Sequence, residues 1–148
     1  MLASWLGALA AITALALISS WSHHPLVVAP FGASTVLLFG HPSSPLAQPR
    51  NIVAGNTLAA LVSVVCVSVW GQAAWVMGLA VALAIALGQL LRCLHPPAGA
   101  VALLGVLLRV GPGFVWMPIL SGSLLLVLMA TLFSRLCRSS TPYPHHWL

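Results

Sequence analysis

The sequence contains no aspartate, no glutamate and no lysine, and its formal charge of +5 comes from five arginines in 148 residues. Without carboxylates there is no acid–base pair, no Ser/His/Asp triad and no oxygen cage for a hard cation such as magnesium. Cys93 and His95 offer a nucleophile and a base, but a spacing this common does not indicate catalysis. We therefore expect no enzyme, and any mechanism has to use arginine, histidine, hydroxyl, amide and backbone groups.

Charged residues make up 3% of the chain, apolar residues 61%, and the mean hydropathy is +1.10. A soluble domain carries about 25% charged residues, so this composition predicts an integral membrane protein whose partner is the lipid bilayer. The arginines are spread between apolar segments and form no basic patch, so no nucleic-acid partner is expected. The cysteines lie far apart and form no CxxC pair, and no cofactor is implied. The arginines are Arg50, Arg92, Arg109, Arg135 and Arg138, and the cysteines are Cys66, Cys93 and Cys137.

The chain contains hydrophobic segments of two lengths. A helix needs about 20 apolar residues to cross a bilayer, and four stretches qualify: 2–20, 52–70, 73–91 and 114–133. Two shorter apolar segments, 31–40 and 98–108, each follow a proline, which suits a first helical turn. The predicted fold class is an all-α membrane protein with four long transmembrane helices and two short, proline-started half-helices.

The two short segments resemble each other. Residues 30–33 read Pro-Phe-Gly-Ala and residues 97–100 read Pro-Ala-Gly-Ala. The match predicts two repeats, at about 2–70 and about 73–136, within one transmembrane domain over 1–148. A short C-terminal tail follows at 137–148, in which 142–147 is expected to be floppy. Broken helices in two such repeats are typical of a transport site at the membrane midplane. The alternative is a chance likeness between two Pro/Gly/Ala-rich stretches.

The arginines indicate a topology. If both short helices cross with the help of extended chain, all arginines but Arg109 share one side, which agrees with the positive-inside rule and makes the repeats inverted. Both termini then lie in the cytoplasm, and a bacterial inner (plasma) membrane is the expected location. If both short helices are re-entrant, the arginines are divided more evenly between the two sides of the membrane.

The inverted arrangement places the two short-helix N-termini opposite each other near the bilayer centre. Helix N-termini present unpaired N–H groups and about half a positive charge, a combination that binds anions. We expect Gly32, Ala33, Ser34, Thr35, Gly99 and Ala100 to contribute to this site, with His95 as a further donor. The alternative is that the glycines only permit close helix packing.

A stripe of small residues at 78, 82 and 86 lies on the third long segment. Such stripes allow another helix to approach closely. Because the chain is small for a complete pathway, the stripe also favours a homo-oligomer.

Three motifs in order, residues 30–40, 45–51 and 94–100, resemble the HPP family of small integral membrane proteins, named for the His-Pro-Pro motif that stands here at 95–97. The resemblance covers nearly the whole chain. It implies a multi-pass bundle and, for some plastid and cyanobacterial members, nitrite transport. The family's motif positions that match here are Pro30, Gly32, Ala33, Gln48, Pro49, Arg50, Asn51, His95, Pro96, Pro97 and Gly99.

The residue pattern predicts a transporter or channel for a small inorganic anion, and the family resemblance implies nitrite as the best candidate. His95 would donate to the anion or carry a proton, or else act as a neutral cap of the short helix. Arg50 and Asn51 would attract and bind the anion. One alternative is a divalent-metal transporter using the pairs at 23–24 and 145–146, although adjacent histidines point to different faces and no metal site is expected. The other is a membrane assembly protein without transport.

Overall fold

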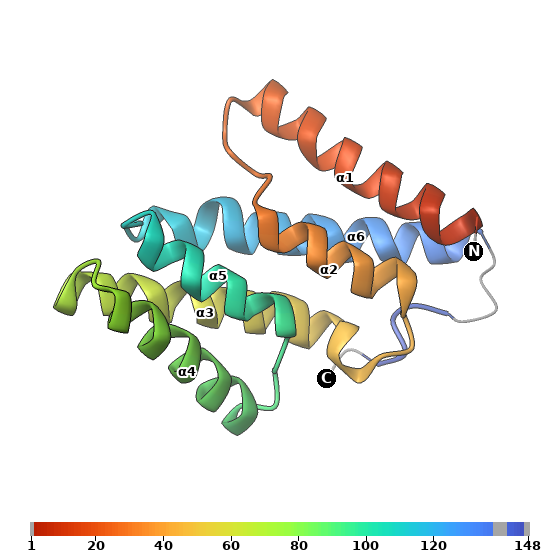
Figure 1. Ribbon diagram of the computed structural model, residues 1–148. Helices are drawn as coiled ribbons and strands as arrows, with labels where there is room; N and C mark the ends of the chain where they lie inside the picture. The colour runs from red at the N-terminus through yellow and green to blue at the C-terminus, as the bar shows by residue number, and fades with distance from the viewer. Residues whose placement is uncertain (1, 138–141, 147–148) are drawn as a thin grey trace.

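The computed structural model describes residues 2–137 and 142–146, which form six α-helices in an elongated bundle (Figure 1). A 3₁₀ turn, η1 (Pro45–Ala47), precedes α3, and a π-helical turn, η2 (Val115–Leu120), leads directly into α6. The all-α prediction is confirmed. The helices are α1 (Leu2–Ser22), α2 (Ala29–Gly40), α3 (Pro49–Trp70), α4 (Ala74–Leu90), α5 (Pro96–Leu107) and α6 (Ser121–Leu136).

Helix length divides the bundle into two classes. Three apolar helices are long enough to cross a membrane: α1, α3 and the segment Val115–Leu136, which is kinked at Met117. At 17 residues α4 is shorter, and about 1.5 Å per residue gives it roughly 25 Å, less than a hydrocarbon core of about 30 Å. The prediction of four long helices is therefore wrong by one. The two short helices are present, with 12 residues each and proline in the first turn.

The two halves of the chain correspond element by element. Shifting Ala29–Gly40 by 67 residues gives Pro96–Leu107, the bounds of α5. Helix α1 packs on α2 and α6, while α4 packs on α5 and α3, so exchanging the halves exchanges the contacts. In Figure 1, α2 and α5 both begin near the middle of the bundle and run in opposite directions.

The small-residue stripe of α4 faces outward. Gly78, Ala82 and Ala86 are exposed, and a Cβ on Gly78 would meet nothing within 4 Å. The face of α4 that packs within the chain instead carries Val76, Ala80, Ala84 and Gly88. Within one chain the stripe therefore does not serve helix packing.

The C-terminal segment 142–146 packs against the bundle, so the prediction of a floppy tail is wrong for these residues. Tyr143 is 4% exposed, and its hydroxyl donates to the Ala47 carbonyl oxygen at 3.0 Å. Its backbone N–H donates to Ser134 Oγ at 2.8 Å. These bonds join the end of α6 to the beginning of α3.

Candidate functional site at the start of the short helices

His95 joins three segments at the centre of the bundle. It precedes α5 and is 2% exposed. Its Nε2 lies 2.8 Å from Ser34 Oγ on α2, and its Nδ1 lies 3.0 Å from the Leu46 carbonyl oxygen in η1. Because a carbonyl oxygen only accepts, Nδ1 carries the hydrogen, and the neutral ring accepts the Ser34 hydroxyl hydrogen at Nε2.

Both ring nitrogens of His95 are therefore occupied within the protein. The ring has no free N–H for an anion, so the structure gives it a positioning role that fixes the start of α5 relative to α2 and η1. Its side chain makes no capping bond to its own helix, which also corrects the expectation of a helix-capping histidine.

The start of α5 has few free backbone donors. Pro96 and Pro97 have no N–H, and the Ala98 N–H donates to the His95 carbonyl oxygen at 2.9 Å. The prediction of several unpaired N–H groups at this helix end is wrong, because the proline pair that starts the helix removes them.

The start of α2 repeats this arrangement. Pro30 lacks an N–H, and the Phe31 N–H donates to the Val28 carbonyl oxygen, also at 2.9 Å. The positive ends of the two helix dipoles remain, and the Ser34–His95 bond holds them side by side.

Arg50 and Asn51 hold the loop that leads to His95. The Arg50 guanidinium donates through Nη2 to the Leu91 carbonyl oxygen at 2.8 Å, where a cation stabilises the C-terminal end of α4. The Asn51 amide donates to the Leu94 carbonyl oxygen at 2.7 Å. Both residues thus lie near the loop before α5, and their side-chain contacts are with the backbone.

Gln48 is a buried bridge that the predicted site omits. Its side chain is 0% exposed, and Nε2 donates to the carbonyl oxygens of Pro42 at 3.2 Å and Ser44 at 2.8 Å. Its Oε1 accepts the His145 backbone N–H at 3.0 Å. The family motif at 45–51 contains Gln48 and was the feature of the sequence that could have pointed to this residue.

The other predicted site residues lie on opposite faces of their helices. Ser34 and Thr35 are buried, and the Thr35 hydroxyl donates to the Phe31 carbonyl oxygen at 2.7 Å. Gly32 and its neighbour at 33 are exposed, and a Cβ on Gly32 would meet nothing within 4 Å. On α5, the residue at 100 is exposed and Gly99 is partly exposed. The structure thus brings Ser34 and His95 together and leaves the glycines outside.

A cavity of about 360 Å³ lies between α4 and the start of α5. It reaches His95 and Gly99, and its other walls are apolar side chains and Pro96. It therefore offers space beside the site and few hydrogen-bonding groups.

Asn56 and Ser123 form a second buried polar contact, and neither was predicted. Both are 0% exposed, and Asn56 Nδ2 donates to Ser123 Oγ at 3.1 Å. Their separation of 67 residues equals the repeat spacing, which was the signal in the sequence. Among the residues described, Asn56 Oδ1 is the one buried side-chain nitrogen or oxygen without a hydrogen-bond partner.

The adjacent glycines place this pair next to the short-helix starts. A Cβ on Gly55 would lie 2.9 Å from the Cβ of His95. A Cβ on Gly122 would collide with the Phe31 ring on α2. The Asn56–Ser123 contact thus lies where α3 and α6 approach both short helices.

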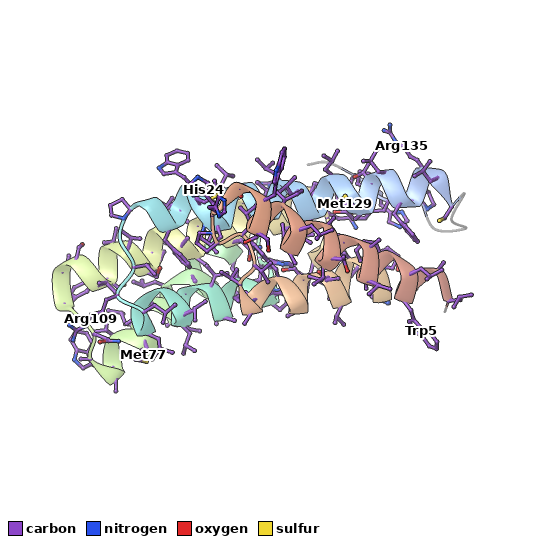
Figure 2. The ribbon with its side chains drawn as sticks, turned by 90° about the horizontal axis from the view of Figure 1, so that it is seen from above. Trp5, His24, Met77, Arg109, Met129 and Arg135 are labelled. Carbon is purple, nitrogen blue, oxygen red and sulfur yellow. The ribbon has the colours of Figure 1, made fainter. Side chains whose placement is uncertain are left out.

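Two of the described arginines mark opposite ends of the bundle. Figure 2 shows Arg109 at one end and Arg135 at the other. Arg50 lies beside Leu91, and the start of α3 is joined to the end of α6 through Tyr143. Arg138 lies outside the described residues.

Cysteine and histidine do not cluster in the described residues. Cys66 and Cys93 are buried and Cys137 is exposed, all as free thiols. Across 2–137 and 142–146, no three histidine or cysteine side chains come together in a way that could hold a metal ion.

Comparison with known proteins agrees with the membrane architecture. Residues 1–144 match the family described as HPP, transmembrane region. Two transmembrane proteins of Dictyostelium discoideum are similar: one is 40% identical over 156 residues, covering 97% of this chain and 54% of the relative, and the other is 36% identical over 160 residues, covering 97% and 50%. The chain spans about half the length of these curated relatives. No solved structure matches. The chain is an integral, multi-pass membrane protein and belongs to the HPP transmembrane-region family.

Proposed function

We propose that this protein is a transporter or channel for a small inorganic anion, with nitrite as the leading candidate from the family resemblance. The observation that carries the proposal is the pair of half-length helices, α2 and α5, which begin side by side in the middle of the bundle. Each directs the positive end of its dipole there, and the chain has no acidic residue to oppose an anion.

The electrostatics of this centre favour negative charge. Two adjacent positive dipole ends act in a low-dielectric interior, where their attraction for an ion is stronger than in water. The buried Asn56 amide and Ser123 hydroxyl add polar groups that partly replace hydration. The pathway that we propose therefore runs between the layer of α2 and α5 and the layer of α3 and α6, past Ser34 and Asn56.

We further propose that the two halves are inverted repeats related by a two-fold axis through this centre. The shared spacing of 67 residues, the exchangeable helix contacts and the opposite directions of α2 and α5 support it. The end of the bundle with Arg135 would face the cytoplasm, and Arg50 and both termini would lie on the same side of the membrane. The exposed stripe on α4 would serve a homo-oligomer.

The test is flux into liposomes that contain the purified full chain, measured for nitrite, nitrate, formate, chloride and divalent cations. We expect flux of small anions above that of protein-free vesicles. Selective flux of a divalent cation would favour the metal-transporter alternative, and no flux of any solute would favour the assembly-protein alternative.

A charge variant tests the helix-terminus site. Ser34→Asp places a carboxylate between the two positive dipole ends, while Ser34→Asn adds similar volume without charge. We expect Ser34→Asp to lower nitrite flux by about tenfold or more relative to Ser34→Asn. Equal flux in two variants that give the same elution profile in detergent would contradict the proposed site.

A further inference from the structure

The Asn56–Ser123 pair leaves two hydrogen-bonding groups unused. Asn56 Oδ1 is buried without a donor, and the described residues offer no acceptor to the Ser123 hydroxyl hydrogen, because Ser123 Oγ is bonded only by Asn56 Nδ2. An unpaired amide oxygen is costly in a protein interior and more so within a bilayer, where water is excluded. An unpaired acceptor next to an unpaired donor indicates a place for a ligand.

The pair also lies where a pathway through the middle of the bundle has to pass. Asn56 and Ser123 occupy equivalent positions of the two proposed repeats, 67 residues apart, so the proposed two-fold axis would pass through their contact. The adjacent Gly55 and Gly122 bring this contact close to the starts of both short helices. On the proposed pathway, a passing molecule has to replace the direct Asn56–Ser123 bond.

The chemistry of the pair selects a ligand that both donates and accepts. A bare anion can accept from Asn56 Nδ2 and the Ser123 hydroxyl, but it leaves Oδ1 without a donor. A neutral oxyacid satisfies all three groups, because its O–H donates to Oδ1 while its other oxygen accepts. We infer that Asn56 and Ser123 bind the undissociated form of a small oxyacid, which for nitrite is nitrous acid; this inference rests on the proposed transport function.

The proton has to travel with the ligand. The chain has no carboxylate or lysine, and His95 Nδ1 already donates to a carbonyl oxygen. On the entry side nitrite, which the two positive dipole ends attract, takes a proton from hydronium to form the O–H bond of the acid and leaves water behind. On the exit side the same bond dissociates to nitrite and a proton. One anion and one proton therefore cross together, and no net charge moves.

The experiment measures nitrite influx, luminal pH and membrane potential in liposomes that contain the full chain, with protein-free liposomes subtracted. At fixed total nitrite and pH well above the pKa of nitrous acid, the inferred flux falls about tenfold for each unit of pH increase, because the acid form falls by that factor. The inferred nitrite flux also acidifies the lumen, and its rate does not change when a potassium diffusion potential is imposed.

Variants assign this behaviour to the pair. Asn56→Leu and Ser123→Ala should lower protein-dependent flux about tenfold or more, whereas Thr131→Val should keep the parental flux. Thr131 is a matched control because it lies on α6, as Ser123 does, and carries a buried hydroxyl. That hydroxyl already donates to the Val127 carbonyl oxygen. Asn56→Leu should elute and unfold as the parent does or at higher temperature, because it removes an unpaired acceptor. If it fails to fold, Ser123→Ala decides.

Three outcomes would overturn the inference. Nitrite flux that carries charge, responds to potential and does not depend on pH would refute it while leaving the proposed anion transport intact. Parental flux in both Asn56→Leu and Ser123→Ala would refute the site. Absence of nitrite flux above protein-free liposomes would refute both the inference and the proposed function.

Discussion

Replacing Gly55 by alanine should destabilise the protein, whereas the same change at Gly32 should stabilise it. A Cβ at position 55 would lie 2.5 Å from the Cys93 carbonyl oxygen, while a Cβ at position 32 would meet nothing within 4 Å. The Cys93 carbonyl cannot easily move away, because Arg50 and Asn51 hold the loop on either side of it. Gly55 thus permits close contact between α3 and the loop before α5.

Two contributions set the expected difference in stability between the variants. Alanine gains about 1 kcal/mol over glycine in a helix interior at both sites. At Gly55 the extra methyl group also causes overpacking, which costs about 1–3 kcal/mol. Gly32→Ala should therefore raise the free energy of unfolding by up to about 1 kcal/mol. The free energy of unfolding of Gly55→Ala should be about 1–3 kcal/mol lower than that of Gly32→Ala.

Thermal unfolding of both variants in the same detergent, followed by tryptophan fluorescence, measures this difference. Gly78→Ala is a second control, because its Cβ also meets nothing within 4 Å. If Gly55→Ala unfolds at the same temperature as Gly32→Ala or above it, the close contact between α3 and the loop before α5 is not rigid, and the reasoning is refuted.

Three further results are expected. Burial raises the pKa of the hydroxyl of Tyr143, the one tyrosine of the sequence, above its usual range. Ultraviolet titration should therefore show ionisation of Tyr143 only above the free value of about 10. The stability of the protein should decline as pH rises through that value, because the unfolded chain loses the proton first. Tyr143→Phe should lower stability by about 1 kcal/mol in thermal unfolding, because the Ala47 carbonyl loses its donor; an unchanged unfolding temperature would show that this bond contributes nothing. In a Cys137→Ser background, cysteines at Arg50 and Arg109 should react with an impermeant maleimide from opposite sides of the membrane, and reaction from one side would reject the inverted topology.

The membrane class and the helices follow from local features of the sequence. Near absence of charge predicts a bilayer protein whatever the fold, because no tertiary arrangement could hide so much apolar surface from water. Proline fixes the starts of α2 and α5, because in the first turn its missing N–H removes no hydrogen bond of the helix. The family resemblance at 95–97 is local as well, and the match over residues 1–144 confirms it.

The roles of individual side chains depended on contacts between distant segments. His95 has two hydrogen-bonding nitrogens in any fold, but only the approach of Ser34 and Leu46 occupies both of them. Likewise, Gly32 and Gly55 are both helical glycines in the sequence, and packing alone decides that one faces outward and the other touches a backbone carbonyl. Periodicity cannot choose which face of an almost wholly apolar helix is buried, because either face is compatible with lipid. The burial of Asn56 against Ser123 was therefore decided by tertiary structure, although the repeat spacing that joins them is present in the sequence.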